Sequence, residues 1–223
     1  MAISRERGRY IVWEGSEGVG KTTQMKLALA ESARRGIETL AVREPGHTKF
    51  GLEIRNILLT PRPPEDDFDA VTEALLYLTD RSHLWTSVIL PALERGIDVH
   101  SDRSWWSSLV YQGVAGGMNL EKLIVLTEIV MSERYIRPDI GLVFLLEEQI
   151  RKQRKHEEAT KSGIGLDRIE QRPDEYFDLV ASGYRKYPIG QFGAHAINAS
   201  GTRDQVKARW WPMVFPPELD LAA

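Results

Sequence analysis

Short apolar runs alternate with longer amphipathic segments along most of the chain. Five runs have the length and the residue types of buried strands: residues 9–14, 37–43, 96–102, 140–146 and 194–198. Between them, apolar positions recur at helical spacing in residues 23–30, 51–59, 69–94, 120–133 and 172–187. The run at 140–146 is the most apolar and is typical of a strand that is buried on both faces. Strands that alternate with helices predict an α/β fold, with a five-stranded, mostly parallel sheet between two layers of helices.

Three stretches break this alternation. Residues 61–67 combine proline with acidic residues, which predicts a surface loop. Residues 147–172 are mostly charged or small, with few apolar positions. Residues 210–217 are apolar but contain prolines, so we expect no helix there, and the segment is left free to pack on the domain or to lie in an interface. Pro91 is expected to interrupt the helix at 69–94.

Composition narrows the class of protein. A length of 223 residues suits one α/β domain, so residues 1–223 are expected to form a single domain, with 208–223 as a C-terminal extension. The net charge of −3 argues against a nucleic-acid-binding surface. The absence of cysteine excludes disulfides, thiolate catalysis and cysteine zinc sites, and it fits a reducing cytosol. A charged N-terminus and the lack of an apolar run near ~18 residues predict a cytoplasmic protein without a signal peptide or membrane anchor.

The most specific motif follows the first predicted strand and precedes the first predicted helix. Its sequence, Gly15-Ser16-Glu17-Gly18-Val19-Gly20-Lys21-Thr22, matches the phosphate-binding pattern G-x-x-x-x-G-K-[ST] in full. The glycines let backbone N–H groups surround an anion, and the helix N-terminus adds partial positive charge. Lys21 is expected to reach the outer phosphates of a nucleoside triphosphate, and the Thr22 hydroxyl to hold Mg2+. These eight residues and Thr23 form the expected triphosphate site.

Two groups with an arginine come next along the chain. Arg43 begins Arg-Glu-Pro-Gly at the end of the second predicted strand, where a guanidinium can bind a phosphate through two hydrogen bonds. Tyr77 and Arg81 lie four residues apart on one helix face, where a ring and a guanidinium can hold a nucleobase. Taken alone, an ordinary turn and an ordinary amphipathic helix remain the simpler explanations.

A third group begins with Asp102 and Arg103, at the end of the third predicted strand. Four polar residues on the following helix complete it: Ser107, Ser108, Tyr111 and Gln112. A carboxylate at this position can hold the water shell of Mg2+, and the adjacent arginine can hold a phosphate. A surface ion pair is the alternative interpretation.

In this order behind the phosphate loop, the three groups resemble the thymidylate kinase family. That family continues with Asp-Arg-x-Glu, which this chain matches as Asp167-Arg168-Ile169-Glu170, and residues 88–96 are also similar to it. The resemblance covers about residues 9–190. It implies a three-layer P-loop kinase fold with a mobile lid at about residues 148–170. It also implies transfer of a phosphoryl group from ATP to dTMP with Mg2+, giving dTDP and ADP in nucleotide biosynthesis, by a homodimer in which the helix at 74–90 is a candidate interface.

The resemblance also assigns the acceptor contacts. Arg43 and Arg103 are implied to clamp the monophosphate of dTMP. Tyr77 is implied to stack on thymine, and Arg81 to meet a base carbonyl. Tyr111 is implied to favour deoxyribose because it crowds the 2′ position. The full set of implied acceptor contacts is Glu17, Arg43, Tyr77, Arg81, Arg103, Ser107, Ser108, Tyr111, Gln112, Asp167 and Arg168.

The resemblance further implies which residues take part in catalysis. They are Lys21, Asp102, Arg103, Arg154 and Lys161, with Thr22 and Asp102 at the Mg2+. Arg154 and Lys161 are drawn from the lid, because the phosphate loop has no basic residue before Lys21. The family's lid arginine falls on Gly163 in this chain, so neither lid residue matches its position.

Two departures from the family lie near the acceptor. His47 follows Arg-Glu-Pro-Gly where the family has glycine, and Ser104 follows Asp-Arg where the family has an aromatic residue. They leave open a deoxynucleoside-monophosphate kinase with a different base preference. A P-loop nucleotide-binding protein with weak catalysis is the second alternative. ATP and dTMP are the expected partners, with neither nucleic acid nor membrane.

Overall fold

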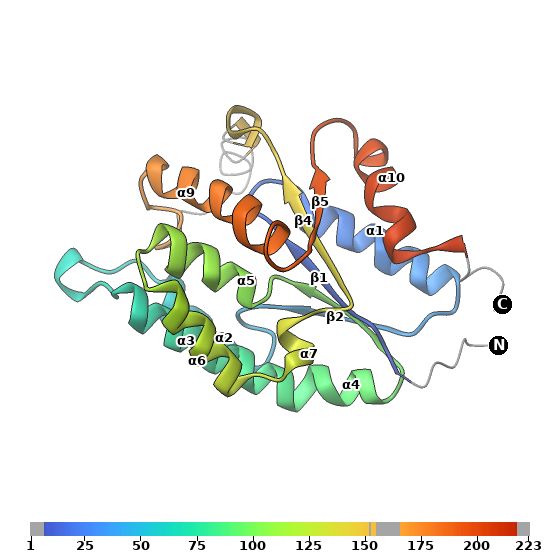
Figure 1. Ribbon diagram of the computed structural model, residues 1–223, viewed down its shortest axis with the longest axis horizontal. Helices are drawn as coiled ribbons and strands as arrows, with labels where there is room; N and C mark the ends of the chain where they lie inside the picture. The colour runs from blue at the N-terminus through green and yellow to red at the C-terminus, as the bar shows by residue number, and fades with distance from the viewer. Residues whose placement is uncertain (1–6, 152, 155–165, 218–223) are drawn as a thin grey trace.

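The computed structural model describes residues 7–151, 153–154 and 166–217 of the chain. Five strands form one sheet in the order β2-β3-β1-β4-β5, and every neighbouring pair is parallel. The strands are β1 (Tyr10–Glu14), β2 (Thr39–Arg43), β3 (Asp98–Asp102), β4 (Ile140–Leu145) and β5 (His195–Asn198). Helices cover both faces of the sheet (Figure 1), which confirms the predicted three-layer α/β class.

The strand that leads into the phosphate loop lies at the centre of the sheet. All residues of β1 and β3 are buried, whereas β2 and β5 at the edges are partly exposed. The register pairs Trp13 of β1 with Asp102 of β3, and Glu14 of β1 with Val143 of β4. The carboxyl ends of these three strands therefore meet at one edge, which is where ligands bind in open α/β sheets.

Each face of the sheet has its own hydrophobic core, because successive side chains of a strand point to opposite faces. Trp13 lies in the core beneath α1 (Lys21–Arg34) and α10 (Arg203–Val214). Its neighbour Val12 lies in the core of the other face. The helices of that face are α3 (Ala70–Leu84), α4 (Leu90–Glu94), α5 (Trp105–Ser108), α6 (Leu120–Val130), α7 (Glu133–Ile136) and α9 (Asp174–Tyr184), and α2 (Lys49–Leu59) packs against α3.

Two prolines lie in or beside helical turns that are wider than an α-helix. The predicted helix at 69–94 is α3, then a π-helical segment (Trp85–Ile89), then α4, in which Pro91 follows the wide turn closely. Pro188 lies within another π-helical segment, Arg185–Ile189. Proline lacks an N–H and its ring clashes with the carbonyl four residues earlier, and a wider turn accommodates both effects. The interruption near Pro91 is therefore a change of helical pitch.

The expectation that residues 210–217 contain no helix is wrong. α10 continues to Val214 and includes Pro212. Proline removes one backbone hydrogen bond, and the burial of one face of the helix outweighs this loss, so the helix continues through Pro212. A capping box between Thr202 and Gln205 begins the helix. Three residues one turn apart bury one face of the helix: Val206, Trp210 and Val214.

Gln24 joins α10 to the helix that follows the phosphate loop. Its Oε1 accepts a hydrogen bond from Trp210 Nε1 at 2.8 Å, and its Nε2 donates to the Arg203 carbonyl at 3.1 Å. The N-terminus of α10 is thereby held in a fixed position relative to α1. The C-terminal segment thus packs on the domain, which the sequence had left open.

The remaining predicted segments agree with the structure with small changes. The predicted helix at 120–133 divides into α6 and α7, and the loop at 61–67 contains one 3-10 turn, Pro64–Asp66.

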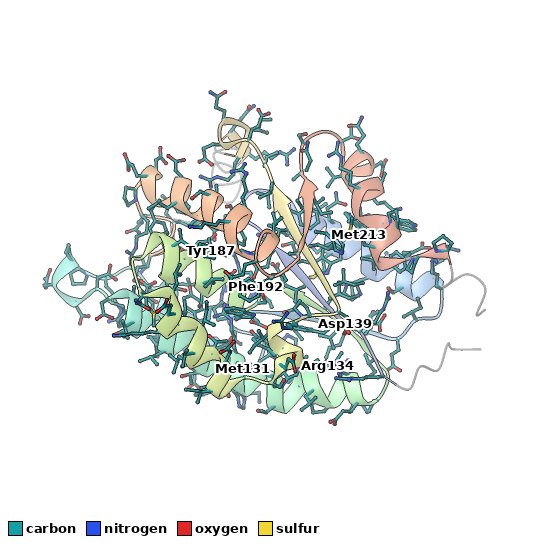
Figure 2. All side chains as sticks on the ribbon, viewed as in Figure 1. Met131, Arg134, Asp139, Tyr187, Phe192 and Met213 are labelled. Atoms are coloured by element: carbon teal, nitrogen blue, oxygen red, sulfur yellow. The ribbon has the colours of Figure 1, made fainter. Side chains whose placement is uncertain are left out.

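At the amino edge of the sheet, Asp139 accepts a hydrogen bond from the Tyr10 N–H at 2.6 Å and lies 3.7 Å from Arg134 (Figure 2). Within the described residues, the helices are all too short or too polar to cross a bilayer.

Gly141 of β4 provides a test of packing between the sheet and α5. A Cβ atom there would clash with Cη2 of Trp106, whose ring packs near Phe192. We expect Gly141→Ala to lower the free energy of unfolding by about 1–3 kcal/mol, because the new methyl group overpacks the core. Urea unfolding measures the change. In a Trp106→Phe background the same substitution should cost less, and an equal cost in both backgrounds would show that Trp106 is not the obstacle.

Candidate active site

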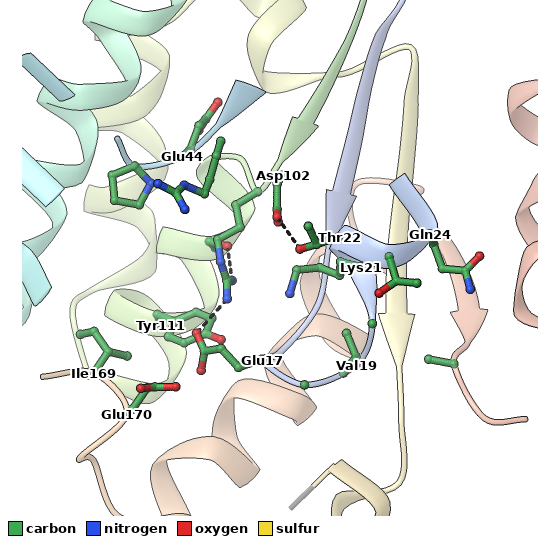
Figure 3. Close-up of a pocket in the computed structure, with 18 of the residues that line it drawn as sticks. Glu17, Val19, Lys21, Thr22, Gln24, Glu44, Asp102, Tyr111, Ile169 and Glu170 are labelled. Carbon is green, nitrogen blue, oxygen red and sulfur yellow. Dashed lines mark hydrogen bonds and ion pairs between the residues drawn. The ribbon is translucent and has the colours of Figure 1, made fainter. Parts of the chain in front are cut away.

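A cavity of about 800 Å³ opens at the carboxyl ends of the central strands. The phosphate loop lies on one side of it, and residues that follow β2 and β3 lie on the other (Figure 3). The sequence-predicted residues that line it are Glu17, Gly18, Val19, Gly20, Lys21, Thr22, Thr23, Arg43, Tyr77, Arg81, Asp102, Arg103, Ser107, Tyr111, Gln112, Arg154 and Asp167. The fold thus brings most of the predicted groups into one hollow.

The backbone of the phosphate loop has a positive φ at each of its three glycines, including Gly18 at 76°. Gly15 has a φ of 134°, and a Cβ atom there would lie 2.5 Å from the Phe144 carbonyl oxygen. Gly20 has a φ of 92° and directly precedes Lys21, the first residue of α1. The loop therefore presents the N-terminus of a 14-residue helix with no acidic residue in its first turn. Such a terminus attracts anions through its free N–H groups and its dipole.

Lys21 is buried beside the loop. Its Nζ donates to the Ser16 carbonyl at 2.9 Å. Burial and, after it, the positive charge of Arg103 lower the pKa of Lys21 to about 8, against the opposing effect of the carboxylates of Asp102, Glu17 and Glu14. An anionic phosphate in the cavity would oppose both effects, because it favours the charged ammonium.

Thr22 and Asp102 bring two oxygen ligands together. The Thr22 hydroxyl donates to Asp102 Oδ2 at 2.9 Å, across the join between α1 and the end of β3 (Figure 3). Within the described residues there is no cluster of three or more His, Cys, Asp or Glu that could hold a metal alone. This pair fits Mg2+, which in phosphate sites takes one or two protein oxygens and completes its shell with water and phosphate.

Arg103 lies between the two sides of the cavity. Its φ of 79° is in the left-handed region, which is uncommon for a residue with a side chain. The guanidinium donates to Glu17 Oε1 at 2.8 Å and to Ser107 Oγ at 3.0 Å, and it lies 5.3 Å from the ring of Tyr111 (Figure 3). The nearby carboxylates and tyrosines raise the pKa of Arg103 against the opposing effect of burial, so it is a permanent cation.

The Glu14 carboxylate holds the segment from Ser104 to Ser107 in place. Glu14 was not among the predicted site residues. Its oxygens accept from the N–H and hydroxyl of Ser104, at 2.7 and 3.0 Å, and from the N–H and hydroxyl of Ser107, at 3.1 and 2.9 Å. The Tyr184 hydroxyl donates to it at 2.8 Å. Ser104 also caps α5, since its hydroxyl accepts from the Trp106 N–H. This explains why a small hydroxyl residue fits at 104.

Arg81 lies at the base of the other half of the cavity, beside an aromatic ring. Its Nε donates to Glu44 at 2.9 Å and its Nη1 to Ser108 at 2.7 Å, while the guanidinium carbon lies 5.2 Å from the Tyr77 ring. Burial raises the pKa of Glu44 to about 7, although Arg81 and the Tyr135 hydroxyl, which donates at 2.6 Å, favour its charged form. A ring and an oriented guanidinium together suit a nucleobase.

Three arginines face the region between these two halves. Arg43 lies at the end of β2, Arg103 follows β3, and Arg55 of α2 donates to the Pro45 carbonyl at 3.2 Å. Burial and the positive charges of Arg43 and Arg103 lower the pKa of Arg55, so an anion between them would be favoured. Arg55 was not among the predicted site residues, because a place on a predicted amphipathic helix gives no sign of a ligand contact.

The far wall comes from Arg154, from three of the residues 167–170 and from the start of α10. Arg154 lines the cavity and donates to the Ala199 carbonyl at 3.5 Å, and Arg203 lines it nearby. Asp167 and Glu170 each accept a hydrogen bond from the other's backbone N–H, at 2.9 and 3.1 Å. Lys161 lies outside the described residues. Residues 199–206 were not predicted to reach the site.

Four predicted site residues that the structure describes are not among those that line the cavity. Gly15 and Ser16 form the back of the phosphate loop, and Ser108 contacts Arg81. Arg168 is turned away, because its Nη1 donates to Glu73 at 2.7 Å and to Asp67 at 2.6 Å. Direct ligand contacts by these residues stay predictions.

Comparison with known proteins gives one consistent family. A family model described as "Thymidylate kinase" matches residues 13–209. A thymidylate kinase of Thermoanaerobacter sp. (strain X514) is 36% identical over 202 residues, which cover 90% of this chain and 93% of that protein. One of Caldicellulosiruptor saccharolyticus is 39% identical over 200 residues, 90% and 92% of the two chains. The crystal structure of thymidylate kinase from Ehrlichia chaffeensis shares the fold, with a TM-score of 0.70 over 93% of this chain and 98% of that one at 22% identity.

The pKa of Lys21 predicts a pH dependence of triphosphate binding. Because that pKa is about 8, the lysine loses its charge in the free protein as the pH rises through that value. We expect affinity for a nucleoside triphosphate, measured by calorimetry, to fall about tenfold or more from about pH 7 to about pH 10, since a hydrogen bond to a charged group contributes about 1.5–3 kcal/mol. Lys21→Ala should bind more weakly with little change over the same range. An equal decline in both proteins would contradict the assignment.

Proposed function

The chain belongs to the thymidylate kinase family, and from that premise we propose how its residues carry out the reaction. The reaction transfers the γ-phosphoryl group of ATP to dTMP, gives dTDP and ADP, and is a step of nucleotide biosynthesis. The observation that carries the proposal is that the phosphate loop and the half built around Tyr77 and Arg81 open into one cavity. Phosphoryl transfer depends mainly on positioning and on neutralising charge, and the cavity has residues for both.

The donor half is proposed to hold ATP by its phosphates. The amides of residues 15–22 bind phosphate oxygens, and Lys21 reaches the β- and γ-phosphates. Thr22 and Asp102 would hold Mg2+, which neutralises charge on the phosphates when it is bound. Adenosine is placed between Arg154 and the start of α10, because this wall of the cavity continues from the phosphate loop.

The acceptor half is proposed to hold dTMP by its base and its phosphate. Tyr77 stacks on thymine, and Arg81 donates to a base carbonyl. The three arginines that face one another bind the monophosphate: Arg43, Arg55 and Arg103. Other lining residues contact the sugar and the edges of the base: Glu17, Ser107, Tyr111, Gln112 and Asp167. Ser108 and Arg168 are proposed to act through Arg81 and through the acidic cluster at Glu73.

Transfer requires no separate general base. The second pKa of a phosphate monoester is about 6, so an oxygen of dTMP is already anionic at neutral pH. That oxygen attacks the γ-phosphorus while the bond from the γ-phosphorus to the bridging oxygen of ADP breaks. Lys21, Arg103 and the lid residue Arg154 are proposed to neutralise the transferred group, with Lys161 as the second lid candidate.

We also propose that the enzyme is a homodimer in the cytoplasm. The apolar residues Ala74 and Leu78, on the helix expected to form the interface, are buried within the chain. Eight of the ten large apolar side chains that are exposed among the described residues instead lie on α2, α3 and α6, which group together in Figure 1. They are Phe50, Leu52, Ile57, Val71, Leu75, Val125, Ile129 and Val130. A group of this kind favours an interface, because single domains rarely expose large contiguous apolar patches.

An assay of purified protein with ATP, Mg2+ and one acceptor at a time tests the function. We expect rapid formation of ADP with dTMP, slower formation with dUMP, and little with dCMP or dGMP. Lys21→Ala should reduce kcat with dTMP by about 10²–10³-fold or more. This loss would exclude a contaminating kinase as the source of the activity, and an unchanged circular dichroism spectrum would show that the variant is folded. Rapid turnover of another monophosphate without turnover of dTMP would contradict the proposal.

Light scattering tests the dimer. Ile129 of α6 is 76% exposed, so Ile129→Glu should leave the fold intact but place a charge in the proposed interface. We expect the variant to have half the mass of the parent protein at micromolar concentration. Leu179→Glu, at a residue of α9 that is 47% exposed and outside the α2, α3 and α6 group, is the matched control and should remain dimeric. A dimeric Ile129→Glu would contradict this interface.

A further inference from the structure

Glu73 of α3 is a buried carboxylate that no motif of the sequence singled out. It is 2% exposed, and three side chains donate to it. Gln112 Nε2 donates to its Oε2 at 3.0 Å, while Arg168 and Arg172 donate to its Oε1 at 2.7 and 2.6 Å. Of these three donors only Gln112 lines the cavity.

The carboxylate of Glu73 determines whether the NH2 group or the oxygen of the Gln112 amide faces it. Glu73 forms ion pairs with two arginines, and a carboxylate in an ion pair accepts hydrogen bonds and does not donate them. The amide of Gln112 must therefore direct its NH2 group at Glu73, because its oxygen would be repelled there. Gln112 lines the same cavity as Tyr77 and Arg81, so the carbonyl oxygen of its amide is the group that it has left to offer to a ligand there.

This orientation distinguishes one class of base from another. The pairing edge of thymine carries a carbonyl acceptor at position 4 and an N–H donor at position 3, whereas cytosine carries an amino donor and a ring-nitrogen acceptor at those positions. Arg81 offers donors and Gln112 offers an acceptor, which matches thymine at both positions and cytosine at neither. A flipped amide would remove the second match.

We propose that Glu73 is a positioning residue that locks the Gln112 amide and so gives the acceptor site its selectivity for thymine over cytosine. This inference rests on the proposed function, in which the cavity binds dTMP. Arg168 and Arg172 take part because both donate to Oε1 of Glu73, which leaves Oε2 for Gln112. Arg168 also donates to the Leu58 carbonyl at 2.7 Å, so the cluster joins residues 168–172 to α2 and α3.

Asp67 provides a matched control. It accepts from Arg168 at 2.6 Å and lies 3.7 Å from Arg172, so it shares both arginines with Glu73. Gln112 donates to Glu73 and not to Asp67. Asp67→Asn therefore weakens the same ion-pair cluster without releasing the Gln112 amide.

The test measures kcat/KM for dTMP and for dCMP in the purified enzyme. In Glu73→Gln the amide of Gln112 is free to turn, and we expect the ratio of the two values to fall about 10- to 100-fold while KM for ATP stays within about twofold. Glu73→Asp keeps the charge that the arginines need but shortens the reach to Gln112, and it should show the same loss of selectivity. Asp67→Asn should keep the parent ratio.

A double-mutant cycle tests whether Glu73 acts through Gln112. In a Gln112→Leu background the amide is absent, so Glu73→Gln should change the ratio no further. An unchanged ratio in folded Glu73→Gln or Glu73→Asp overturns the inference, and so does an equal loss in Asp67→Asn or an additive cycle. A parent enzyme that does not prefer dTMP to dCMP contradicts the proposed function itself, whereas a selective parent with selective Glu73 variants contradicts this inference alone.

Discussion

The carboxylate of Glu14 is the interaction on which the arrangement of the site depends. A buried charge is stable only when hydrogen bonds replace its lost water, and Glu14 obtains them from two serines and a tyrosine distant in sequence. Glu14 directly precedes the phosphate loop, and Ser104 directly follows Arg103. The requirement to satisfy one carboxylate therefore sets the position of the donor loop relative to the cation that faces the acceptor.

Buried carboxylates also orient the side chains of the acceptor half. Glu44 orients Arg81, and Glu73 holds Gln112 together with two arginines. Replacing water around such groups costs free energy, so buried pairs of this kind contribute less to stability than to fixed orientation. Side chains that are already oriented need little rearrangement when a substrate binds, which is how an enzyme lowers the barrier to transfer. The acceptor half is in this sense built before its ligand arrives.

Local patterns of the sequence predicted the strands, the phosphate loop and the side of the sheet at which ligands bind. These features depend on residues close together in the chain, such as the glycines around Lys21 or the apolar run of β4. Glu14 and Glu73 were missed because their partners lie tens of residues away, and an acidic residue in a strand or helix gives no local signal of such a partner. Glu44 lies in the Arg-Glu-Pro-Gly turn that the sequence singled out, but its contact with Arg81 is equally distant in the chain. Arg55 was missed for the same reason. Pro212 misled the helix prediction, because the burial of Trp210 and its neighbours outweighs the loss of one backbone hydrogen bond.

The two separate cores of the sheet have a consequence for how such an enzyme changes over evolutionary time. The helices that carry the phosphate loop and α10 pack into one core, and the helices that carry Tyr77, Arg81 and Gln112 pack into the other. Repacking of one core acts first on the helices of its own face of the sheet. A lineage can therefore accumulate changes beneath its acceptor site, and change the base that it accepts, as long as the contacts of Glu14 that position the phosphate loop are kept.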